Sequence, residues 1–445
     1  MNQNDDTRRS SRREFLRDAA VTAAATVAVA SVAKSSVYAL APPRVIGAND
    51  RIRAGHVGVG GQGLAHIRML QENAAAFNVE NIAVCDIYNR RTRLARELLN
   101  LPEARGFDDY RRLLEVREID AVWISTADNW HEPITTAAME AGKHVYVEKP
   151  LCRTIEETFR IYDTCKRTQR VLQVGSQGCS DPKWHVARKA VADGKIGHAI
   201  MGQGSFCRNS REGEWNYYAI DEGAGPSATG DNFINWDVFR RGTEPAQWCP
   251  DRFFRWRKYW AYGTGIVGDL FPHRLHPLVI AMNLPTTGEG GWPSRVASLG
   301  GIFVQRTSPV TNGPDREVPD FTNLVADFHE NCSIMLLGST INEQGWQDMI
   351  RGTKGTLFFG GAGVDVRPER VWADEIEGGN LPVEGEGERL DVHQKDFVDC
   401  IRTGRTPTAG IDLAARVQVM VSMAETAYRM TRTVTFDPRT RQMTA

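Results

Sequence analysis

Two separate stretches of the sequence supply side chains that could move a proton. K-H-V-Y-V-E-K-P at 143–150 contains Lys149, and G-T-G-I-V-G-D-L-F-P-H-R-L-H at 263–276 contains Asp269 and His273. Asp269 and His273 lie four positions apart, one turn of a helix, so both can face one ligand. Histidine titrates near neutral pH, and a cation can stabilise an oxygen that loses its proton. This pattern predicts alcohol oxidation, in which His273 exchanges the hydroxyl proton, Lys149 holds the same oxygen and Asp269 orients the pair.

Each of these side chains also has an ordinary structural interpretation. Asp269 could cap a helix, and His273 could be a hydrogen-bonded core residue. Lys149 could form an ion pair with its neighbour Glu148. We favour catalysis because all three residues occur together, downstream of a nucleotide-binding motif.

That motif is a glycine turn between a predicted strand and a predicted helix. Gly58, Gly60 and Gly63 form G-x-G-x-x-G after the run R-I-R-A-G-H-V. Such a turn brings the backbone close to a pyrophosphate, and the helix that follows offers free N–H groups to it. The residues of this turn that we predict to contact a dinucleotide are Gly58, Gly60, Gly61, Gln62 and Gly63.

The next predicted strand, N-I-A-V-C-D, ends at Asp86, 23 residues after Gly63. A carboxylate at this point can accept both ribose hydroxyls of the adenosine half, which favours NAD. Arg90 and Arg91 follow closely and could bind the 2'-phosphate of NADP, so NADP remains possible. Asp86 could instead be the N-cap of a helix over 89–99.

Polar residues follow two more predicted strands, D-A-V-W-I-S-T at 120–126 and 143–147, with a helix over 131–142 between them. Ligands of open parallel sheets bind outside the carboxyl ends of the strands. The charges that follow the second strand therefore lie at the rim of the sheet, where they can meet a ligand. The residues of this edge that we predict to contact the cofactor are Thr126, Asn129, His131, Glu148 and Lys149.

The glycine turn, the E-K-P at 148–150 and the segment 263–276 together resemble the Gfo/Idh/MocA family of oxidoreductases. The resemblance spans about 50–430. In these relatives the second domain carries Asp and, four positions later, His or Tyr, which Asp269 and His273 match. The family often has Asp three positions after that His, where this chain has His276.

The resemblance implies an α/β fold in which a doubly wound, parallel Rossmann sheet precedes an α/β domain with a large, mainly antiparallel sheet. It places the Rossmann domain at 50–172, the substrate and oligomerisation domain at 173–410, and a closing helix that packs back on the Rossmann domain at 411–435. Strand-like runs occur at 198–207, 295–305, 321–328 and 332–340. The open face of the second sheet commonly forms dimers or tetramers in this family, so we expect a homo-oligomer.

Tryptophans alternate with Arg and Lys over 233–262. Such a pattern can stack on nucleic acid bases, but the formal net charge of -1 argues against that partner. Aromatic rings also suit the C–H faces of sugars, although a long loop pinned by large side chains is an equal alternative. The candidate substrate neighbours are Trp256, Tyr259, Trp260 and His276.

The N-terminus has the order of an export signal. Arg12 and Arg13 precede an Ala/Val-rich stretch over 19–33 and small residues near Ala39, which predicts a twin-arginine signal over 1–41 and an exported protein. No later segment is apolar enough to span a bilayer. The eight cysteines show no C-x-x-C pair, so we predict no metal site and buried free thiols.

These features predict an exported, nicotinamide-dependent oxidoreductase that acts on a secondary hydroxyl of a sugar, sugar derivative or cyclitol. A cofactor bound tightly before export would have to be regenerated by a second substrate or within one catalytic cycle. The alternative is an NAD-dependent glycosidase or lyase that works by transient oxidation and elimination. Such glycosidases usually replace the lysine of E-K-P, so Lys149 favours the oxidoreductase. A catalytically silent sugar-binding protein is the second alternative.

Overall fold

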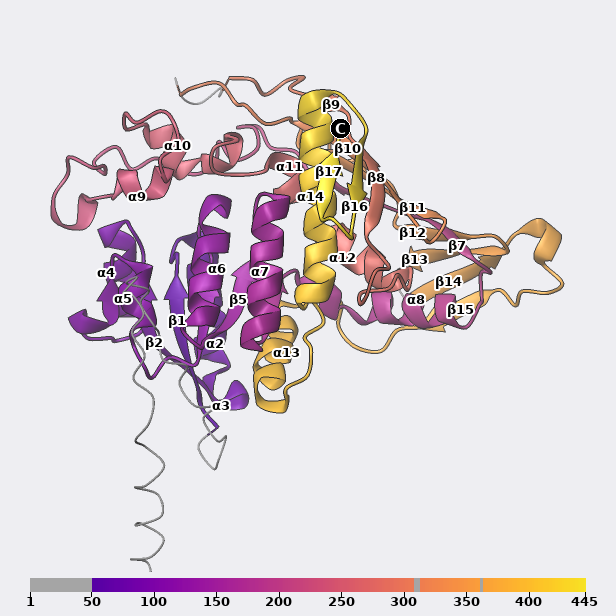
Figure 1. Cartoon of the computed structure of the whole chain (residues 1–445), viewed down its shortest axis with the longest axis horizontal. Helices are drawn as coiled ribbons and strands as arrows, with labels where there is room; N and C mark the ends of the chain where they lie inside the picture. Colours follow the sequence, from indigo (N-terminus) through magenta and orange to yellow (C-terminus); the bar gives the residue numbers. More distant parts are fainter. Residues whose placement is uncertain (1–49, 308–312, 361–362) are drawn as a thin grey trace, which may run out of the picture. The chain divides into compact units, whose positions relative to one another are not determined.

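The computed structural model describes residues 50–307, 313–360 and 363–445 (Figure 1). The predicted signal segment, 1–41, lies outside the described residues. Within the described ranges, no helix has the length and hydropathy needed to cross a membrane.

Residues 52–175 of the described chain form a six-stranded parallel sheet in the order β3-β2-β1-β4-β5-β6. Its strands are β1 (Ile52–Val57), β2 (Val79–Cys85), β3 (Gly106–Phe107), β4 (Ala121–Ile124), β5 (His144–Glu148) and β6 (Leu172–Gly175). Its helices are α2 (Gly61–Glu72), α3 (Ala74–Phe77), α4 (Asn89–Leu98), α5 (Tyr110–Leu114), α6 (His131–Glu140) and α7 (Ile155–Thr168). Every residue of β4 is buried, as expected for a strand covered on both faces. The predicted doubly wound Rossmann sheet is confirmed, and its strand order reverses between β1 and β4, where such sheets bind ligands.

The predicted large, mainly antiparallel second sheet is confirmed. In the described residues it has 11 strands, and β7 and β11 form a parallel pair within it. Its strands are β7 (Ala199–Cys207), β8 (Pro293–Ala297), β9 (Gly300–Gly301), β10 (Phe321–Phe328), β11 (Cys332–Ser339), β12 (Met349–Gly352), β13 (Gly355–Gly360), β14 (Gly363–Pro368), β15 (Gly379–Pro382), β16 (Val434–Asp437) and β17 (Gln442–Thr444). Buried and half-exposed residues alternate along β10 and β11. One face of this sheet therefore carries the core, and the other carries half-exposed side chains.

The remaining helices cover the buried face of the second sheet or join it to the Rossmann domain. They are α8 (Pro182–Ala192), α9 (Trp236–Arg240), α10 (Pro250–Phe254), α11 (Gly265–Asp269), α12 (Pro272–Ala281), α13 (Leu390–Thr403) and α14 (Ile411–Met430). The long helix α14 contacts α7 and β6 on one side and β8 and α12 on the other. It is buried around nearly its whole circumference, as a helix between two layers must be.

The predicted strand over 295–305 is wrong in its second half. Only β8 and the two-residue β9 form there, and the backbone N–H groups of Phe303, Val304 and Gln305 donate to the carboxylate of Asp320 at 2.8, 2.9 and 2.7 Å. A carboxylate that collects three successive N–H groups replaces a neighbouring strand as their partner, so the chain turns there.

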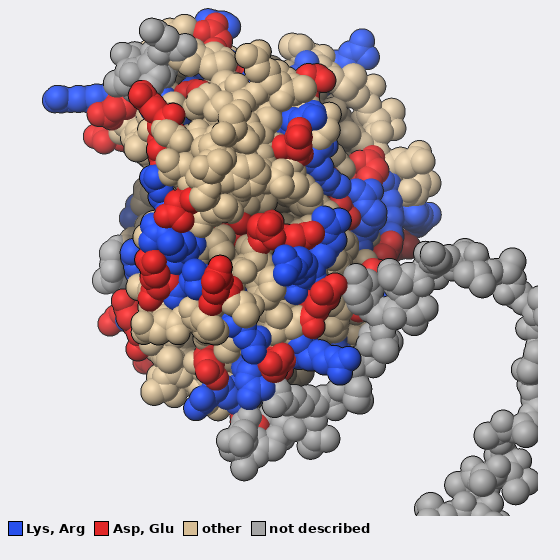
Figure 2. All heavy atoms as spheres, turned by 90° about the vertical axis from the view of Figure 1, so that its left-hand side faces the viewer, with Lys and Arg blue, Asp and Glu red and all other residues tan. Residues whose placement is uncertain are grey.

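The surface in Figure 2 shows no separation of the two signs of charge. Lys and Arg side chains lie among Asp and Glu side chains across its lower part, and uncharged side chains dominate its upper part, at the height of α9 and α10 in Figure 1. This face therefore lacks the basic stripe that a nucleic-acid backbone requires.

The close approach of α2 to β1 makes Gly63 a strict requirement of the fold. A Cβ at Gly63 would lie 2.0 Å from the carbonyl oxygen of Gly58, whereas a Cβ at Gly61 would have no atom within 4 Å. We expect Gly63→Ala to lower the free energy of unfolding by roughly 2 kcal/mol, because a backbone carbonyl cannot move aside as a side chain can. Gly61→Ala, the matched control, should change it by less than about 1 kcal/mol. Urea denaturation of both variants tests this, and equal losses would contradict the packing argument.

Candidate functional site

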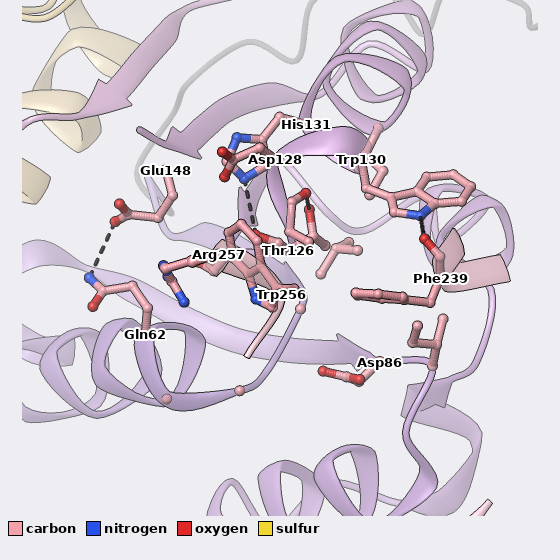
Figure 3. Close-up of a pocket in the computed structure, with 18 of the residues that line it drawn as sticks. Gln62, Asp86, Thr126, Asp128, Trp130, His131, Glu148, Phe239, Trp256 and Arg257 are labelled. Atoms are coloured by element: carbon pink, nitrogen blue, oxygen red, sulfur yellow. Dashed lines mark hydrogen bonds between the residues drawn. The ribbon is translucent and has the colours of Figure 1, made fainter. Parts of the chain in front are cut away.

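A cleft of about 790 Å³ opens at the carboxyl ends of the parallel strands (Figure 3). Its floor comes from the ends of β1, β2, β4 and β5, and its other wall comes from segments that follow the parallel sheet in sequence, between residues 177 and 273. The predicted site residues that line it are Gly58, Gly60, Gly61, Gln62, Asp86, Thr126, His131, Glu148, Lys149, Trp256, Asp269 and His273. Both stretches that the sequence marked as chemically active therefore reach one cavity.

The glycine turn leaves the start of α2 open to this cleft. Gly60 is the N-cap, no side chain caps the helix and no acidic residue lies in its first turn. Gly58 has φ +82°, and a Cβ there would lie 2.7 Å from the carbonyl carbon and oxygen of Ser125. Exposed N–H groups at an uncapped helix start, beside a backbone with no room for side chains, fit a pyrophosphate. Gly63 lies behind the turn and packs α2 against it rather than lining the cleft.

Asp86 stands at the end of β2 with both carboxylate oxygens fixed. One oxygen accepts the N–H of Val59 at 2.9 Å, and the other accepts the N–H of Tyr88 at 3.0 Å. Burial raises the pKa of this carboxyl, and the charge of Arg91 opposes the rise. Each oxygen can still accept a hydroxyl, which suits the two hydroxyls of a ribose. The N-cap of α4 is Tyr88, so the alternative in which Asp86 caps this helix is wrong.

Residues 221–241, here called the strap, cross over this end of the cleft from the part of the chain that follows β7. The backbone of Asn235 donates to the carbonyl of Ile87 at 3.0 Å, and that of Asn89 donates to Phe233 at 3.1 Å. Side chains reinforce this contact, because Tyr88 donates to Asp221 at 2.6 Å and Arg90 pairs with the same carboxylate. The strap lines the cleft through Asn235, Val238 and Phe239.

Lys149 is held by Asp269 and not by Glu148. Its ammonium donates to the carbonyl oxygen of Asp269 at 2.7 Å and to the carboxylate at 2.9 Å. Arg257 donates to the same carboxylate oxygen at 3.1 Å. Burial alone would raise the pKa of Asp269, but these two cations lower it well below its usual range. The ion pair of Lys149 with Glu148, considered from the sequence, does not form.

His273 faces the same cleft as a neutral ring. It stacks on Phe206 with ring centroids 5.2 Å apart, and its buried Nδ1 has no hydrogen-bond partner. Burial, followed by the charge of Lys149, lowers the pKa of His273 to about 3. A neutral imidazole without partners can accept a proton, so the interpretation as a hydrogen-bonded core histidine is wrong.

Glu148 is a buried carboxylate on the wall of the cleft. It accepts from His66 at 2.8 Å and from Gln62 at 3.2 Å, the second of which Figure 3 shows as a dashed line. Burial works against its charge, but the hydrogen bond from His66 and neighbouring positive charges lower the pKa of Glu148 to about 2. The sequence did not mark His66, which lies on α2 one turn beyond Gln62 and could have been found from that helical spacing.

Asp128 is a second functional candidate, which the sequence analysis did not mark as a site residue. Its side chain is 2% exposed, lines the cleft and accepts from the hydroxyl of Thr264 at 3.1 Å. Burial, and then the nearby charge of Asp269, raise the pKa of Asp128 to about 7. An acid of this kind can exchange a proton at neutral pH.

Two predicted cofactor contacts at this edge have structural roles. The ring of His131 lies between the carbonyl oxygens of Pro150, at 2.7 Å, and Thr126, at 3.2 Å, and so ties two strand ends together. Asn129 lies outside the cleft lining, where its amide donates to the carbonyl of Phe239 at 3.1 Å and anchors the strap.

Three of the four predicted substrate neighbours do not line the cleft. Tyr259 is fully buried behind its wall, where its hydroxyl bonds to Asp251. Trp260 packs against the core of the second sheet, and His276 is buried in α12 with its Nδ1 2.9 Å from the carbonyl oxygen of Pro272. Large aromatic rings next to a motif can pack in the core as well as against a ligand. In this structure all three pack in the protein interior. Trp256 alone of the four reaches the cleft.

Residues 52–176 match the model of the GFO_IDH_MocA family, described as "Oxidoreductase family, NAD-binding Rossmann fold". Over these residues the chain is similar to the Gfo/Idh/MocA family. The glycine turn, the open start of α2 and Asp86 are thus the parts of an NAD-binding oxidoreductase domain, and they would hold the pyrophosphate and the adenosine ribose of NAD.

A curated relative, "Glycosyl hydrolase family 109 protein" of Shewanella sp. (strain W3-18-1), is 28% identical over 78% of this chain and 73% of its own length. Alignments to the next relatives of that description cover only 45% to 55% of their lengths. Among solved structures, "Levoglucosan dehydrogenase, complex with NADH" has a TM-score of 0.64 at 18% identity and covers 86% of this chain and 98% of its own. "Aldose-aldose oxidoreductase from Caulobacter crescentus complexed with glycerol" has a TM-score of 0.61 at 18% identity and covers 87% and 100%. These two structures show that the fold is shared.

The raised pKa of Asp128 makes a test of the site's electrostatics possible. The folded protein holds this proton more tightly than the unfolded chain, so its contribution to stability falls as pH rises from about 4 to 7. We expect Asp128→Asn, which can still accept from Thr264, to be more stable than the parent by roughly 4 kcal/mol above pH 7 and by much less near pH 4. Urea denaturation across this range measures the difference, with the exposed Asp374→Asn as the control for net charge. A difference that does not change with pH would contradict the assignment.

Proposed function

We propose that the protein oxidises a secondary hydroxyl of a sugar, sugar derivative or cyclitol and transfers the hydride to a tightly bound NAD. The observation that carries the proposal is the meeting of Lys149, Asp269 and His273 in the cleft that holds the glycine turn. The first two supply a fixed cation, and the third supplies a neutral base. Bound NAD would supply the hydride acceptor.

The chain's own groups divide the work of such an oxidation. Lys149, oriented by Asp269, binds the hydroxyl oxygen and stabilises the negative charge that develops on it. His273 accepts the hydroxyl proton on an imidazole nitrogen as hydride leaves the carbon. Because the ammonium lies beside the ring and lowers its pKa, the proton is released easily when the product leaves.

The part of the cleft beyond Lys149 suits a carbohydrate. Phe206, Tyr217, Tyr218 and Trp256 line it, and aromatic faces pack well against the C–H faces of sugar rings. Arg257 lies over Trp256, 4.2 Å from the ring centroid, and would offer N–H donors to hydroxyl oxygens. The names of structural neighbours, levoglucosan dehydrogenase and aldose-aldose oxidoreductase, support this substrate class.

A second candidate, glycoside cleavage through transient oxidation and elimination, is favoured by the description "Glycosyl hydrolase family 109 protein" of the curated relatives. It begins with the same oxidation and ends with the hydride returned, so it needs the same Lys149 and His273. Asp128 would serve as the additional proton donor or acceptor that elimination requires. A catalytically silent sugar-binding protein is less well supported, because the base and the cation are both in place.

We also propose that the protein is exported through the twin-arginine route and forms a homo-oligomer. The first rests on Arg12, Arg13 and the apolar stretch that follows. The second rests on apolar residues at the half-exposed positions of the second sheet, among them Val325, Met335 and Leu337. Secretion assays in a strain without the twin-arginine translocase and sedimentation of the purified protein test the two, and secretion that persists or a monomer would contradict them.

The oxidation itself is tested with purified protein and a panel of sugars, glycosides and cyclitols. We expect a rise in absorbance at 340 nm. Lys149→Met and His273→Asn should each lower kcat/KM by roughly a hundredfold or more, because the first removes the cation that stabilises the developing negative charge and the second removes the base. Lys189→Met, on the exposed side of α8, is the matched control. Release of an aglycone without net NADH would favour the glycosidase, and a signal that persists in both variants would contradict the proposal.

The strap predicts slow release of the cofactor. We expect Asp221→Ala to speed the dissociation of NAD by roughly tenfold, because it removes the partner of both Tyr88 and Arg90 and loosens the cover over the adenosine end. Asp231→Ala, the control, removes a more exposed pair with Arg93 in the same strap and should change the rate little. Displacement of labelled NAD by excess unlabelled NAD measures both rates. Equal rates in the two variants would show that the strap does not retain the cofactor.

A further inference from the structure

A buried chain of hydrogen bonds links α13, late in the sequence, to Glu148 in the cleft. The indole N–H of Trp123 on β4 donates to Oε1 of Gln394 at 3.2 Å. Nε2 of Gln394 lies 2.5 Å from Nδ1 of His66, and Nε2 of His66 lies 2.8 Å from Oε1 of Glu148. Trp123, Gln394 and His66 are each 0–1% exposed, so water does not compete for these bonds.

The chemistry of the donors fixes every proton along this chain. An indole nitrogen can only donate, so the amide oxygen of Gln394 accepts and its NH₂ group faces His66. Nδ1 of His66 must then be the acceptor, which leaves the single ring proton of the neutral imidazole on Nε2. That N–H points at Oε1 of Glu148, which accepts it. Every hydrogen bond in this series therefore donates in the same direction, from the indole of Trp123 toward the carboxylate of Glu148.

The structure around Glu148 is built to keep its charge in place. Gly175 on the neighbouring strand β6 makes room for it, because a Cβ there would lie 2.6 Å from Oε1. Gln62 donates to the same oxygen at 3.2 Å, and the backbone N–H of Lys149 lies 3.3 Å from the other. The carboxylate therefore sits on the wall of the cleft with donors on its protein side.

We propose that Gln394 and His66 are positioning residues that hold Glu148 as an anion at the nicotinamide end of the cleft, where it favours binding of cationic NAD⁺ over neutral NADH. This inference rests on the proposed function, because that function defines which end of the cleft would hold the nicotinamide of NAD. Asp86 marks the adenosine end, and Lys149 and His273 mark the end where hydride is transferred. A fixed charge beside a cofactor ring shifts its reduction potential, so a bound NADH would return its hydride more readily. This suits both a second-substrate cycle and a glycosidase cycle.

A purely structural role would give different behaviour. Buried polar contacts that only fasten α13 under the sheet would, when broken, weaken the binding of NAD⁺ and NADH alike. The ratio of the two affinities, and its dependence on pH, separates the two explanations. The groups near His66 or Glu148 that could titrate are His56, His393, His273 and Tyr146, and Lys149 places a positive charge next to Glu148. Burial lowers the pKa of His56 and His393 to about 4 and that of His273 to about 3, and it raises that of the tyrosine, so none of these four groups changes charge near neutral pH.

The first measurement compares the dissociation constants of NAD⁺ and NADH by calorimetry in the full-length protein. We expect Glu148→Gln, which can still accept from His66, to reduce the preference for NAD⁺ by about tenfold through NAD⁺ alone. Gln344→Glu, an exposed change of similar size, is the control and should leave the ratio as in the parent. An unchanged ratio in Glu148→Gln would overturn the proposal.

The second variant, Gln394→Glu, keeps the shape of the side chain but cannot donate to Nδ1. His66 must then place a proton on Nδ1, and the two flanking carboxylates favour the charged imidazolium. As pH rises and this proton is lost, the site becomes more negative, so the preference for NAD⁺ should increase with pH beyond any trend in the parent. Asp128, whose pKa is about 7, contributes equally to both proteins and cancels in the comparison. Parallel pH curves for the two proteins would overturn the role of Gln394.

A spectroscopic test of the ring protonation of His66 does not depend on cofactor binding by any variant. In ¹⁵N-histidine-labelled protein, the His66 signal, assigned by its loss in His66→Gln, should show the proton on Nε2 in the parent and on Nδ1 in Gln394→Glu. A parent ring with its proton on Nδ1 would overturn the proposal even if every variant folds poorly. If the affinity ratio shifts as expected but no sugar reduces NAD, the proposed function fails and this inference stands. If sugars are oxidised and the ratio of the two affinities does not shift, the proposed function stands and this inference fails.

Discussion

The ion pair between Lys149 and Asp269 is the contact on which the rest of the site depends. It joins the end of β5 in the Rossmann domain to the end of α11 in the second half of the chain. Buried charges are costly unless they are paired and hydrogen-bonded, and removing one partner leaves the other uncompensated. Here the ammonium bonds both the carbonyl and the carboxylate of Asp269, and Arg257 adds a second cation. The pair therefore fixes where a substrate oxygen can bind and keeps both sides of the cleft at a set distance.

The pair can hold a substrate oxygen in one place only if the Rossmann domain and the second domain keep a fixed relative position. Three segments distant in sequence fix that position. The strap bonds to the loop after β2, and α13 packs Phe397 against Trp123 and Tyr146 beneath the parallel sheet. The helix α14 lies between α7 and β8, and its Asp412 accepts from Tyr162 and Lys166. The cleft is thus shaped by contacts that run over hundreds of residues, and only its chemical groups come from short motifs.

That division explains what the sequence could predict. The glycine turn, the acid at Asp86 and the four-residue spacing of Asp269 and His273 are local patterns whose geometry follows from one turn or one strand. The bond between His66 and Gln394 joins residues 328 positions apart, so no spacing rule reveals it. The prediction that aromatic residues of 233–262 contact the substrate was largely wrong for a different reason. Rings such as Tyr259 have the same composition signal in a core as around a sugar, and only packing decides between them.

Burial lowers the pKa of one group in the site and raises the pKa of another, and in both cases it favours the neutral form. It lowers the pKa of His273 to about 3 and raises that of Asp128 to about 7, because in each case it disfavours the charged form. Lys149 and Asp269 stay charged beside them because they are paired. When His273 accepts a proton, the new imidazolium stands beside the ammonium, which opposes it, and near the carboxylates of Asp269 and Glu148, which favour it. The two anions therefore allow a buried, neutral base to become charged briefly during the reaction, and the ammonium makes it give the proton up again.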